Sequence, residues 1–196
     1  MKKTFFLPLV TIVLAAALLL SLSFGLKGIT EANGRNVHVK LMQTLLPGSS
    51  EFTVVPYSGD DANIRSVHRG ETGFVIETVT YGYAGEITMF IGVSKDGRVT
   101  GLTVADMQET FGLGANALND HAFLKQFLNT DGGVAIGVQA DAFSGATGDS
   151  SAETDTYVDG ISGATVTSKA IARCVNSAVA YVTGADVSSG ATSWGG

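Results

Sequence analysis

The first clear pattern of apolar and polar positions is an uncharged apolar run from Phe5 to Leu26. As a helix, at about 1.5 Å per residue, this run would be ~33 Å long, which is enough to cross the core of a bilayer. Two lysines precede it, so residues 1–4 are predicted to be cytoplasmic and residues 27–196 to lie outside the cytoplasm. The pattern therefore predicts a single-pass anchor over residues 5–26 in the cell membrane.

A cleavable signal peptide is the alternative interpretation of this run. Its apolar region would usually span about 7–15 residues, with a small-residue cleavage site after it. Here the Ala15-Ala16-Ala17 cluster lies inside the run, and Leu18-Leu19-Leu20 follows it. An anchor is therefore favoured.

Strand-like patterns begin at Phe74. Phe74–Tyr83 and Glu86–Ser94 are rich in Val, Ile, Thr and aromatic residues, which favour strands. Val99–Ala105 continues the pattern after Asp96-Gly97, a pair that tolerates the positive φ of a hairpin turn. These segments predict an antiparallel meander, and with the helices described below they predict an α+β fold.

The region between the anchor and the strands, residues 27–73, is predicted to be a linker. A helix is expected within Ile29–Leu46, and Pro47-Gly48 should end it. The polar stretch Ser58–Gly73 is predicted to be a loop. His68 falls in this stretch and is treated as a surface residue, because no second ligand stands at metal-binding spacing from it.

After the meander, Asp106–Gly114 follows neither the helical nor the strand period and is predicted to be a loop. Asp120 is a candidate N-cap for a short helix whose buried face would contain Phe123, Phe127 and Leu128. Val134–Gln139 is predicted to be a further strand.

The last helical pattern lies within Asp159–Val182. Its apolar positions recur at the spacing of one helix face: Ile171, Val175, Ala178, Val179 and Val182. Thr167 and Ser168 are predicted N-caps, because a short hydroxyl can accept a hydrogen bond from an amide of the first turn. The Ser- and Gly-rich tail, residues 184–196, is predicted to be disordered.

One heptapeptide pattern occurs three times, as DAFSGAT (Asp141–Thr147), DGISGAT (Asp159–Thr165) and DVSSGAT (Asp186–Thr192). Only the second repeat leads into a long helix. The amides of a helix start favour an anion, and a phosphate at Thr165 would offset the unfavourable Lys169 in the first turn. The alternative is a helix that simply follows a tight turn.

Charge and composition limit the possible functions. From Lys27 onward there are 10 basic and 18 acidic residues, a balance of 10 − 18 = −8, which argues against nucleic acid as a partner. The single cysteine, Cys174, is interpreted as a core residue. No nicotinamide fingerprint and no cysteine cluster for an iron–sulfur centre stands in the sequence, and no metal site is predicted.

Three motifs in order carry a family resemblance: GYAGEI (Gly82–Ile87), ETFGLG (Glu109–Gly114) and SGATVTS (Ser162–Ser168). Together they resemble the FMN-binding domain of membrane redox complexes, as found in the G subunit of the Rnf ion-translocating electron-transport complex and the C subunit of the sodium-translocating NADH:quinone reductase. The resemblance implies an FMN-binding domain over residues 74–183, with an antiparallel sheet and flanking helices. Phe111 stands where the family usually has proline.

The resemblance also implies the site residues. Thr165 would carry FMN through a phosphoester bond, attached by a separate flavin transferase that uses FAD. Residues Ser162, Gly163, Ala164, Val166, Thr167 and Lys169 would surround the phosphate. Residues Glu109, Thr110, Gly112, Leu113 and Gly114 would lie along the flavin, with Tyr83 and Gly85 of the GYAGEI turn as further cofactor-binding residues. No catalytic residue is implied.

The function that follows from this resemblance is that of an electron carrier. The chain would be one subunit of an ion-translocating complex with other membrane subunits, rather than a self-contained enzyme with its own diffusible substrate. Two alternatives stay open at this point. One is a membrane-tethered reductase with non-covalent FMN, and the other is an interaction domain without redox chemistry.

Overall fold

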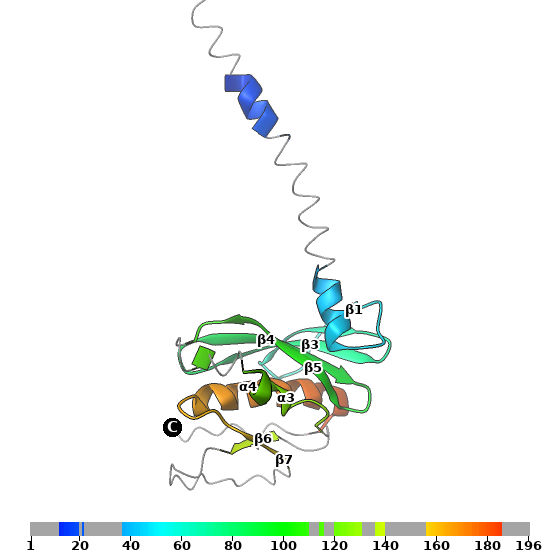
Figure 1. Ribbon diagram of the computed structural model, residues 1–196. Helices are drawn as coiled ribbons and strands as arrows, with labels where there is room; N and C mark the ends of the chain where they lie inside the picture. Colours follow the sequence, from blue (N-terminus) through cyan, green and yellow to red (C-terminus); the bar gives the residue numbers. More distant parts are fainter. Residues whose placement is uncertain are drawn as a thin grey trace, which may run out of the picture. The chain divides into compact units, whose positions relative to one another are not determined.

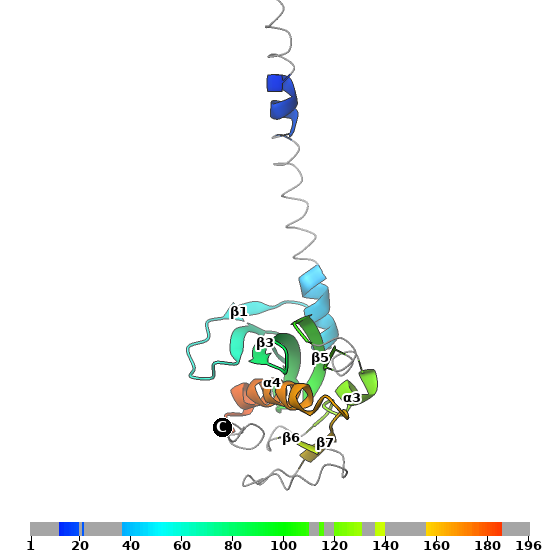
Figure 2. The ribbon, with the colours of Figure 1, turned by 90° about the vertical axis from the view of Figure 1, so that its left-hand side faces the viewer.

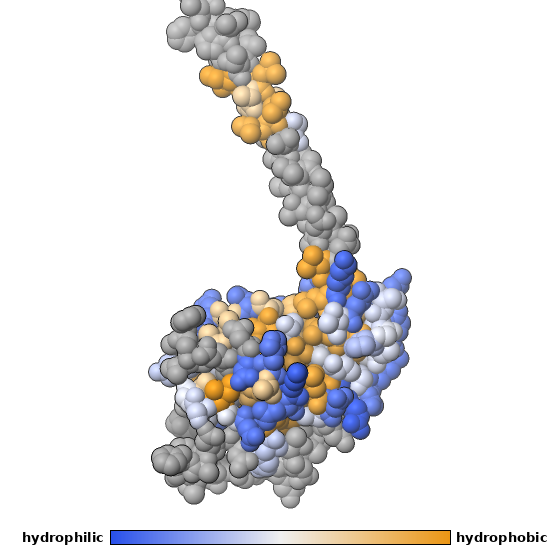
Figure 3. Space-filling view, viewed as in Figure 1, coloured by the Kyte–Doolittle hydropathy of each residue, from blue (hydrophilic) through white to orange (hydrophobic). Residues whose placement is uncertain are grey.

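The computed structural model describes residues 12–19, 21, 37–109, 114–115, 120–130, 136–139 and 156–185. The chain divides into two compact units, Met1–Leu41 and Met42–Gly196. In the first unit, residues 12–19 form a helix whose apolar side chains are exposed (Figure 3). Within the described residues, no helix is both long and apolar enough to cross a membrane. The rest of the predicted anchor lies outside them.

A five-stranded antiparallel sheet is the main element of the second unit (Figure 1). It confirms the predicted meander and extends it by two strands. At the turn after its fourth strand, Gly97 has φ 85°, as expected of an Asp-Gly hairpin. The strands lie in chain order: β1 (Thr53–Val55), β2 (Ile64–Arg69), β3 (Gly73–Tyr81), β4 (Glu86–Ser94) and β5 (Val99–Met107).

The loop predicted for Ser58–Gly73 is wrong over Ile64–Arg69, which form β2. The register with β3 shifts between Ile64 and Ser66, so Arg65 is an extra residue in the ladder. Such a bulge interrupts the alternation of inward and outward side chains, which is the pattern that identifies a strand in a sequence. His68 is accordingly half-buried in a strand rather than on a surface loop.

A long helix, α4 (Thr165–Thr183), packs under the five-stranded sheet. On its other side lie β6 (Ile136–Gln139) and β7 (Thr156–Asp159), which pair in parallel (Figure 2). The strand predicted at Val134–Gln139 is confirmed over its described part. The sequence did not indicate β7, whose four residues are too few to show a period.

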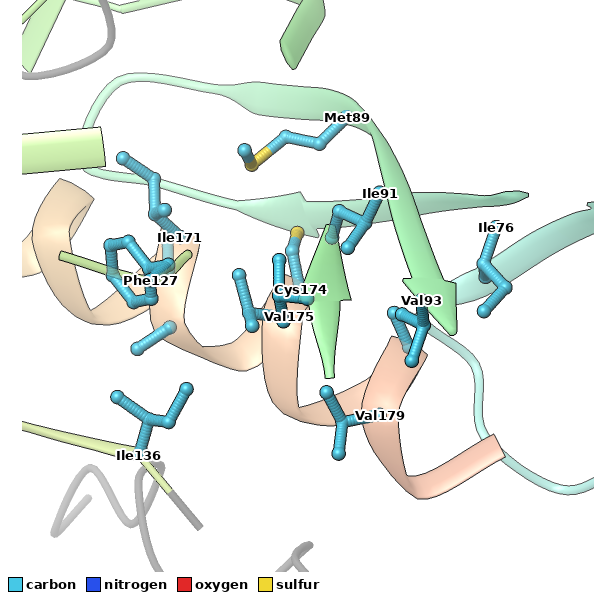
Figure 4. Packing of buried hydrophobic residues seen from close by; sticks show 14 of the residues in the cluster. Ile76, Met89, Ile91, Val93, Phe127, Ile136, Ile171, Cys174, Val175 and Val179 are labelled. Carbon is cyan, nitrogen blue, oxygen red and sulfur yellow. The ribbon is translucent and has the colours of Figure 1, made fainter. Parts of the chain in front are cut away.

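Because α4 lies between two sheets, it is buried on more than the predicted face. Ile171, Val175, Ala178 and Val179 are buried as predicted, and Val182 is half-buried. They pack against Ile76, Met89, Ile91 and Val93 of the large sheet and Ile136 of the small one (Figure 4). Cys174 is a core residue as predicted, and burial raises the pKa of its thiol to about 11.

The short helix α3 (His121–Lys125) has the predicted cap. Asp120 Oδ1 accepts hydrogen bonds from the amides of Ala122 at 2.8 Å and Phe123 at 3.2 Å. Phe123 and Phe127 are buried in an edge-to-face contact with centroids 5.3 Å apart, and Leu128 is half-buried. Both rings belong to the hydrophobic core, where Phe127 lies next to Ile171 and Ile136 (Figure 4).

Within the second unit, the residues just before β1 pack on the face of the large sheet opposite α4 (Figure 2). Residues 37–45 are helical and end at the predicted Pro47-Gly48 turn, where Gly48 has φ 86°. Leu45 and Leu46 are buried, and the carbonyl of Leu45 accepts a hydrogen bond of 2.6 Å from Thr100 Oγ1. The close approach is possible because two glycines, Gly92 and Gly101, are register partners beneath it.

We therefore expect Gly92→Ala to destabilise the domain by about 1–3 kcal/mol, the usual cost of overpacking. The added Cβ would collide with the Leu45 carbonyl oxygen and would lie 2.8 Å from Thr100 Oγ1. Urea denaturation measures the effect. Ala105→Val is the control, because residue 105 is exposed on β5. Equal stabilities of the two variants would contradict the close packing of Leu45 on β4.

Candidate functional site

The second SGAT repeat forms the turn that leads into α4. The Ala164 amide donates to the Ile161 carbonyl at 2.9 Å, and Gly163 has φ 79°. A positive φ at the third position is typical of a type II turn and explains the glycine. The helix begins at Thr165, with Ala164 as its N-cap.

The prediction that Thr167 and Ser168 cap the helix is wrong. Both lie inside its first turn and are buried. The Ser168 hydroxyl instead accepts a hydrogen bond of 3.2 Å from the amide of Ile161 and so fixes the turn before the helix. Because of the Gly163 turn, the helix begins at Thr165. Thr167 and Ser168 are therefore inside the helix and cannot cap its start.

The start of α4 has the properties of an anion site. Ala164 makes no side-chain cap, the first turn contains no acidic residue, and the Ser168 amide bonds the Ala164 carbonyl at 2.8 Å. The amides of Thr165, Val166 and Thr167 therefore precede the first intrahelical hydrogen bond, and they form the positive end of the helix dipole. Thr165 and Val166 are half-buried, whereas Ser162 and Gly163 are exposed, so the site is accessible from solvent.

A buried hydroxyl, that of Thr167, lies next to this helix start. Thr167 Oγ1 has no hydrogen-bond partner within the described part of the chain, and the residue is 1% exposed. A Cβ added to Gly114 would lie 2.7 Å from this oxygen and would collide with the carboxylate of Glu109. The fold thus brings Glu109 and Gly114 of the ETFGLG motif to the SGATVTS motif.

Glu109 also joins the GYAGEI motif to this cluster. Its Oε1 accepts a hydrogen bond of 2.7 Å from the amide of Tyr83. Gly82 has no room for a side chain because of the same carboxylate, and Gly85 lies against Gln108. The Tyr83 side chain is 73% exposed. Thr110, Gly112 and Leu113 lie outside the described residues, so their predicted place along the flavin stays a prediction.

Two charged side chains lie on one side of α4. Arg173 donates from Nη2 to the Tyr81 carbonyl at 2.8 Å, a contact that the sequence did not indicate. Lys169, four residues earlier, is half-buried on the same side of the helix. Two basic residues four positions apart, in a helix whose other residues are mostly small or apolar, are the sequence signal that could have identified Arg173.

Two side-chain amides hold the small sheet that leads to the turn. Asn176 accepts from the Ile136 amide at 2.9 Å and donates to the Ile136 carbonyl at 3.1 Å. Gln126 accepts from the Asp159 amide at 2.8 Å and donates to its carbonyl at 3.3 Å. The last residue of β7 is therefore positioned just before the SGAT turn. The repeats ending at Thr147 and Thr192 lie outside the described residues.

Residues 82–180 match the FMN-binding domain family. The chain belongs to this family. The match begins in the GYAGEI turn and ends within α4, so it contains all three motifs, and the protein binds FMN. The resemblance stated from the motifs is confirmed.

Curated relatives support the same assignment. The chain is 29% identical to the G subunit of the Na⁺-translocating ferredoxin:NAD⁺ oxidoreductase complex of Acetobacterium woodii, covering 91% of each chain. It is 32% identical to the G subunit of an ion-translocating oxidoreductase complex of Methanosarcina acetivorans, covering 72% of each.

Among solved structures, the C subunit of the Na⁺-translocating NADH-quinone reductase of Parabacteroides distasonis has the same fold. Its TM-score is 0.50 at 20% identity, and the match covers 68% of this chain and 77% of that one.

The residues at the start of α4 fit FMN. A phosphate needs amide donors and positive potential, which the uncapped helix start supplies. The Thr167 hydroxyl, which has no partner among the described residues, is a further polar group for a bound ligand, because a buried hydroxyl without a partner is rare in native proteins. The glycines at 82, 85 and 114 leave no room for side chains between the three motifs.

We expect Thr167→Val to stabilise the flavin-free protein by about 1 kcal/mol and to reduce the additional stability that FMN confers. Valine has the same shape and removes an unpaired buried hydroxyl. Denaturation of flavin-free and flavin-loaded protein measures both effects. Thr78→Val is the control, because Thr78 Oγ1 is also buried but lies on β3, beside the Cys174 thiol rather than at the start of α4. If both variants respond equally to FMN, Thr167 does not face the cofactor.

Proposed function

We propose that this protein is a membrane-anchored electron carrier of an ion-translocating electron-transport complex, with FMN joined to Thr165 by a phosphoester. The observation that supports attachment is the position of Thr165 as the first residue of α4. Its side chain is half-buried beside the exposed Ser162 and Gly163, so an external enzyme can reach it. The three leading amides of the helix are placed to bind the phosphate once it is attached.

Attachment by a flavin transferase balances as a phosphoryl transfer. The threonine hydroxyl oxygen forms a bond to the FMN phosphorus of FAD, the pyrophosphate bond breaks, AMP leaves and the hydroxyl proton passes to solvent. In this chain Gly163 and Ala164 keep the approach to the hydroxyl open, because neither has a bulky side chain. Lys169 and the helix start contribute positive charge, while Val166 and Thr167 contribute backbone amides.

The second part of the site would position the flavin ring. Glu109 and Gly114 lie next to Thr167, and Tyr83 and Gly85 stand on the turn that Glu109 holds. Thr110, Gly112 and Leu113 complete the same motif in the sequence. When bound, the flavin supplies electron transfer, and the chain's own residues fix its position and exclude other groups from its faces.

The membrane location is supported by the apolar run of residues 5–26. Its helical part exposes Ile12, Val13, Leu14, Leu18 and Leu19, each at least 60% exposed, so the side chains are placed to contact lipid. Lys2 and Lys3 would hold the N-terminus in the cytoplasm and place the FMN domain outside it. There FMN lost by dissociation could not be replaced by mass action, and a covalent bond prevents that loss.

Partner subunits follow from the relatives. Proteins 29% and 32% identical to this chain are named as G subunits of ion-translocating oxidoreductase complexes. We infer that this chain also works with other membrane subunits that deliver and remove electrons.

A denaturing gel viewed under ultraviolet light tests the attachment. The full chain, produced with a flavin transferase, should give a fluorescent band after boiling. Its intact mass should increase by one FMN unit joined through its phosphate. Protein produced without the transferase should give neither. Flavin that is released on boiling would instead support a tethered reductase with non-covalent FMN.

Protease added to intact spheroplasts tests the topology. The FMN domain should be digested while the N-terminus stays protected. Protection of the whole domain until lysis would contradict the proposed orientation. A soluble mature protein without residues 1–26 would identify the apolar run as a signal peptide.

A further inference from the structure

We propose that Glu109 and Arg173 are positioning residues that hold the β3–β4 turn, residues 81–85, as a fixed wall beside the flavin. The turn is closed by a hydrogen bond of 2.8 Å from the Gly82 amide to the Gly85 carbonyl. The inference rests on the proposed function in one respect, the placement of the flavin against this turn.

Two charged side chains from different elements bind the backbone on either side of Gly82. Arg173 of α4 donates to the Tyr81 carbonyl at 2.8 Å, and Glu109, which follows β5, accepts from the Tyr83 amide at 2.7 Å. Hydrogen bonds with one ionised partner are roughly twice as strong as neutral ones. The turn is therefore held at Tyr81 and at Tyr83 by hydrogen bonds to charged side chains.

The turn has little apolar packing that could hold it instead. The side chains of Tyr81 and Tyr83 are 70% and 73% exposed, and Ala84 is also exposed. Gly82 and Gly85 give the backbone a wide choice of conformations. With few buried contacts, a turn of this kind opens locally at low cost unless polar contacts restrain it. Glu109 and Arg173 supply that restraint.

Both contacts connect the turn to the helix that carries Thr165. Arg173 belongs to α4 itself, and no carboxylate of the described residues lies within ion-pair distance of it. Its guanidinium group instead donates a hydrogen bond to the Tyr81 carbonyl. Glu109 lies beside Gly114, where an added Cβ would meet both the Glu109 carboxylate and Thr167 Oγ1 of α4. The attachment point and the wall are therefore fixed relative to one another.

The test uses the full chain loaded with flavin, in the variants Arg173→Met, Arg173→Lys and Glu109→Leu. Amide hydrogen exchange of the peptide that contains residues 81–85 should accelerate about tenfold or more in Arg173→Met and Glu109→Leu, because each loses a hydrogen bond to a charged group. Arg173→Lys, which keeps a charged donor, should restore part of the protection.

The flavin readouts separate positioning from stability alone. In Arg173→Met and Glu109→Leu, the visible spectrum should move toward that of free FMN, and the fluorescence anisotropy of the oxidised flavin should fall. In Arg173→Met, the amount of covalent FMN should stay at the wild-type value, because Thr165 and the helix start are intact. Arg65→Met is the matched control, since Arg65 binds the Glu86 side chain at 3.1 Å at the same end of the sheet but no backbone of the turn.

Unchanged hydrogen exchange in the turn would overturn the assignment of the two residues. Faster exchange with an unchanged flavin spectrum and anisotropy would overturn the turn as a flavin wall. A failure of the proposed covalent attachment would appear separately, as loss of flavin from the wild-type protein on boiling. The native spectra of the variants would still decide the inference in that case.

Discussion

Thr165→Val should yield a protein without covalent flavin. Valine keeps the β-branched shape of a half-buried residue at the start of α4, so the fold should be retained, but it removes the oxygen that forms the phosphoester. The expected change is complete loss of in-gel fluorescence after boiling and of the FMN phosphoryl mass. Circular dichroism of the variant checks that the helix and sheets persist.

The two other SGAT repeats provide the controls for this variant. Thr147→Val and Thr192→Val should both retain the full amount of covalent flavin, because neither residue leads into a long helical pattern that could bind the phosphate. Loss only in Thr147→Val would mean that the first repeat is the attachment site. Partial loss in two variants would mean that the transferase recognises the heptapeptide rather than its structural setting.

Asn176→Ala should lower the free energy of unfolding by about 2–6 kcal/mol, because it leaves two buried backbone groups without partners. The Asn176 side chain is 5% exposed and satisfies both the amide and the carbonyl of Ile136. The small sheet should loosen, and with it the path from β7 into the SGAT turn. Urea denaturation measures the stability, and covalent flavin per protein measures the effect on the site.

Ser177→Ala is the neighbouring control on α4. Its hydroxyl accepts one hydrogen bond, from Asn63 Nδ2 at 3.2 Å, so the loss should be about 1 kcal/mol. A cost for Asn176→Ala no larger than that for Ser177→Ala would show that the two bonds to Ile136 contribute little to the small sheet.

Elements with a strong local pattern were predicted well, and those with an interrupted pattern were not. β3, β4 and β5 are rich in strand-forming residues over nine residues each, and their turn at Gly97 has its own local chemistry. β2 lies in a polar stretch, and the bulge at Arg65 breaks the alternation that would identify it as a strand. β7 has only four residues, too few to show a period.

The start of α4 shows how a local rule can select the correct region and the wrong atom. Hydroxyl residues at a helix start are usually caps, and the sequence has two of them at Thr167 and Ser168. The Gly163 turn begins the helix earlier, so Ser168 bonds the Ile161 amide and Thr167 is left buried. The path of the chain before the helix decides which hydroxyl accepts a hydrogen bond from which amide.

The sequence by itself determined the family, the cofactor and the residues of the three motifs, because each motif is a short continuous stretch whose residue types reflect local backbone needs. Only the tertiary structure decided that Glu109 and Gly114 lie beside Thr167, and that Arg173 and Asn176 bind backbone groups of Tyr81 and Ile136. These contacts join residues that are far apart in the chain. They depend on the packing of α4 between two sheets, and a pattern of neighbouring residues does not show which distant residues will meet.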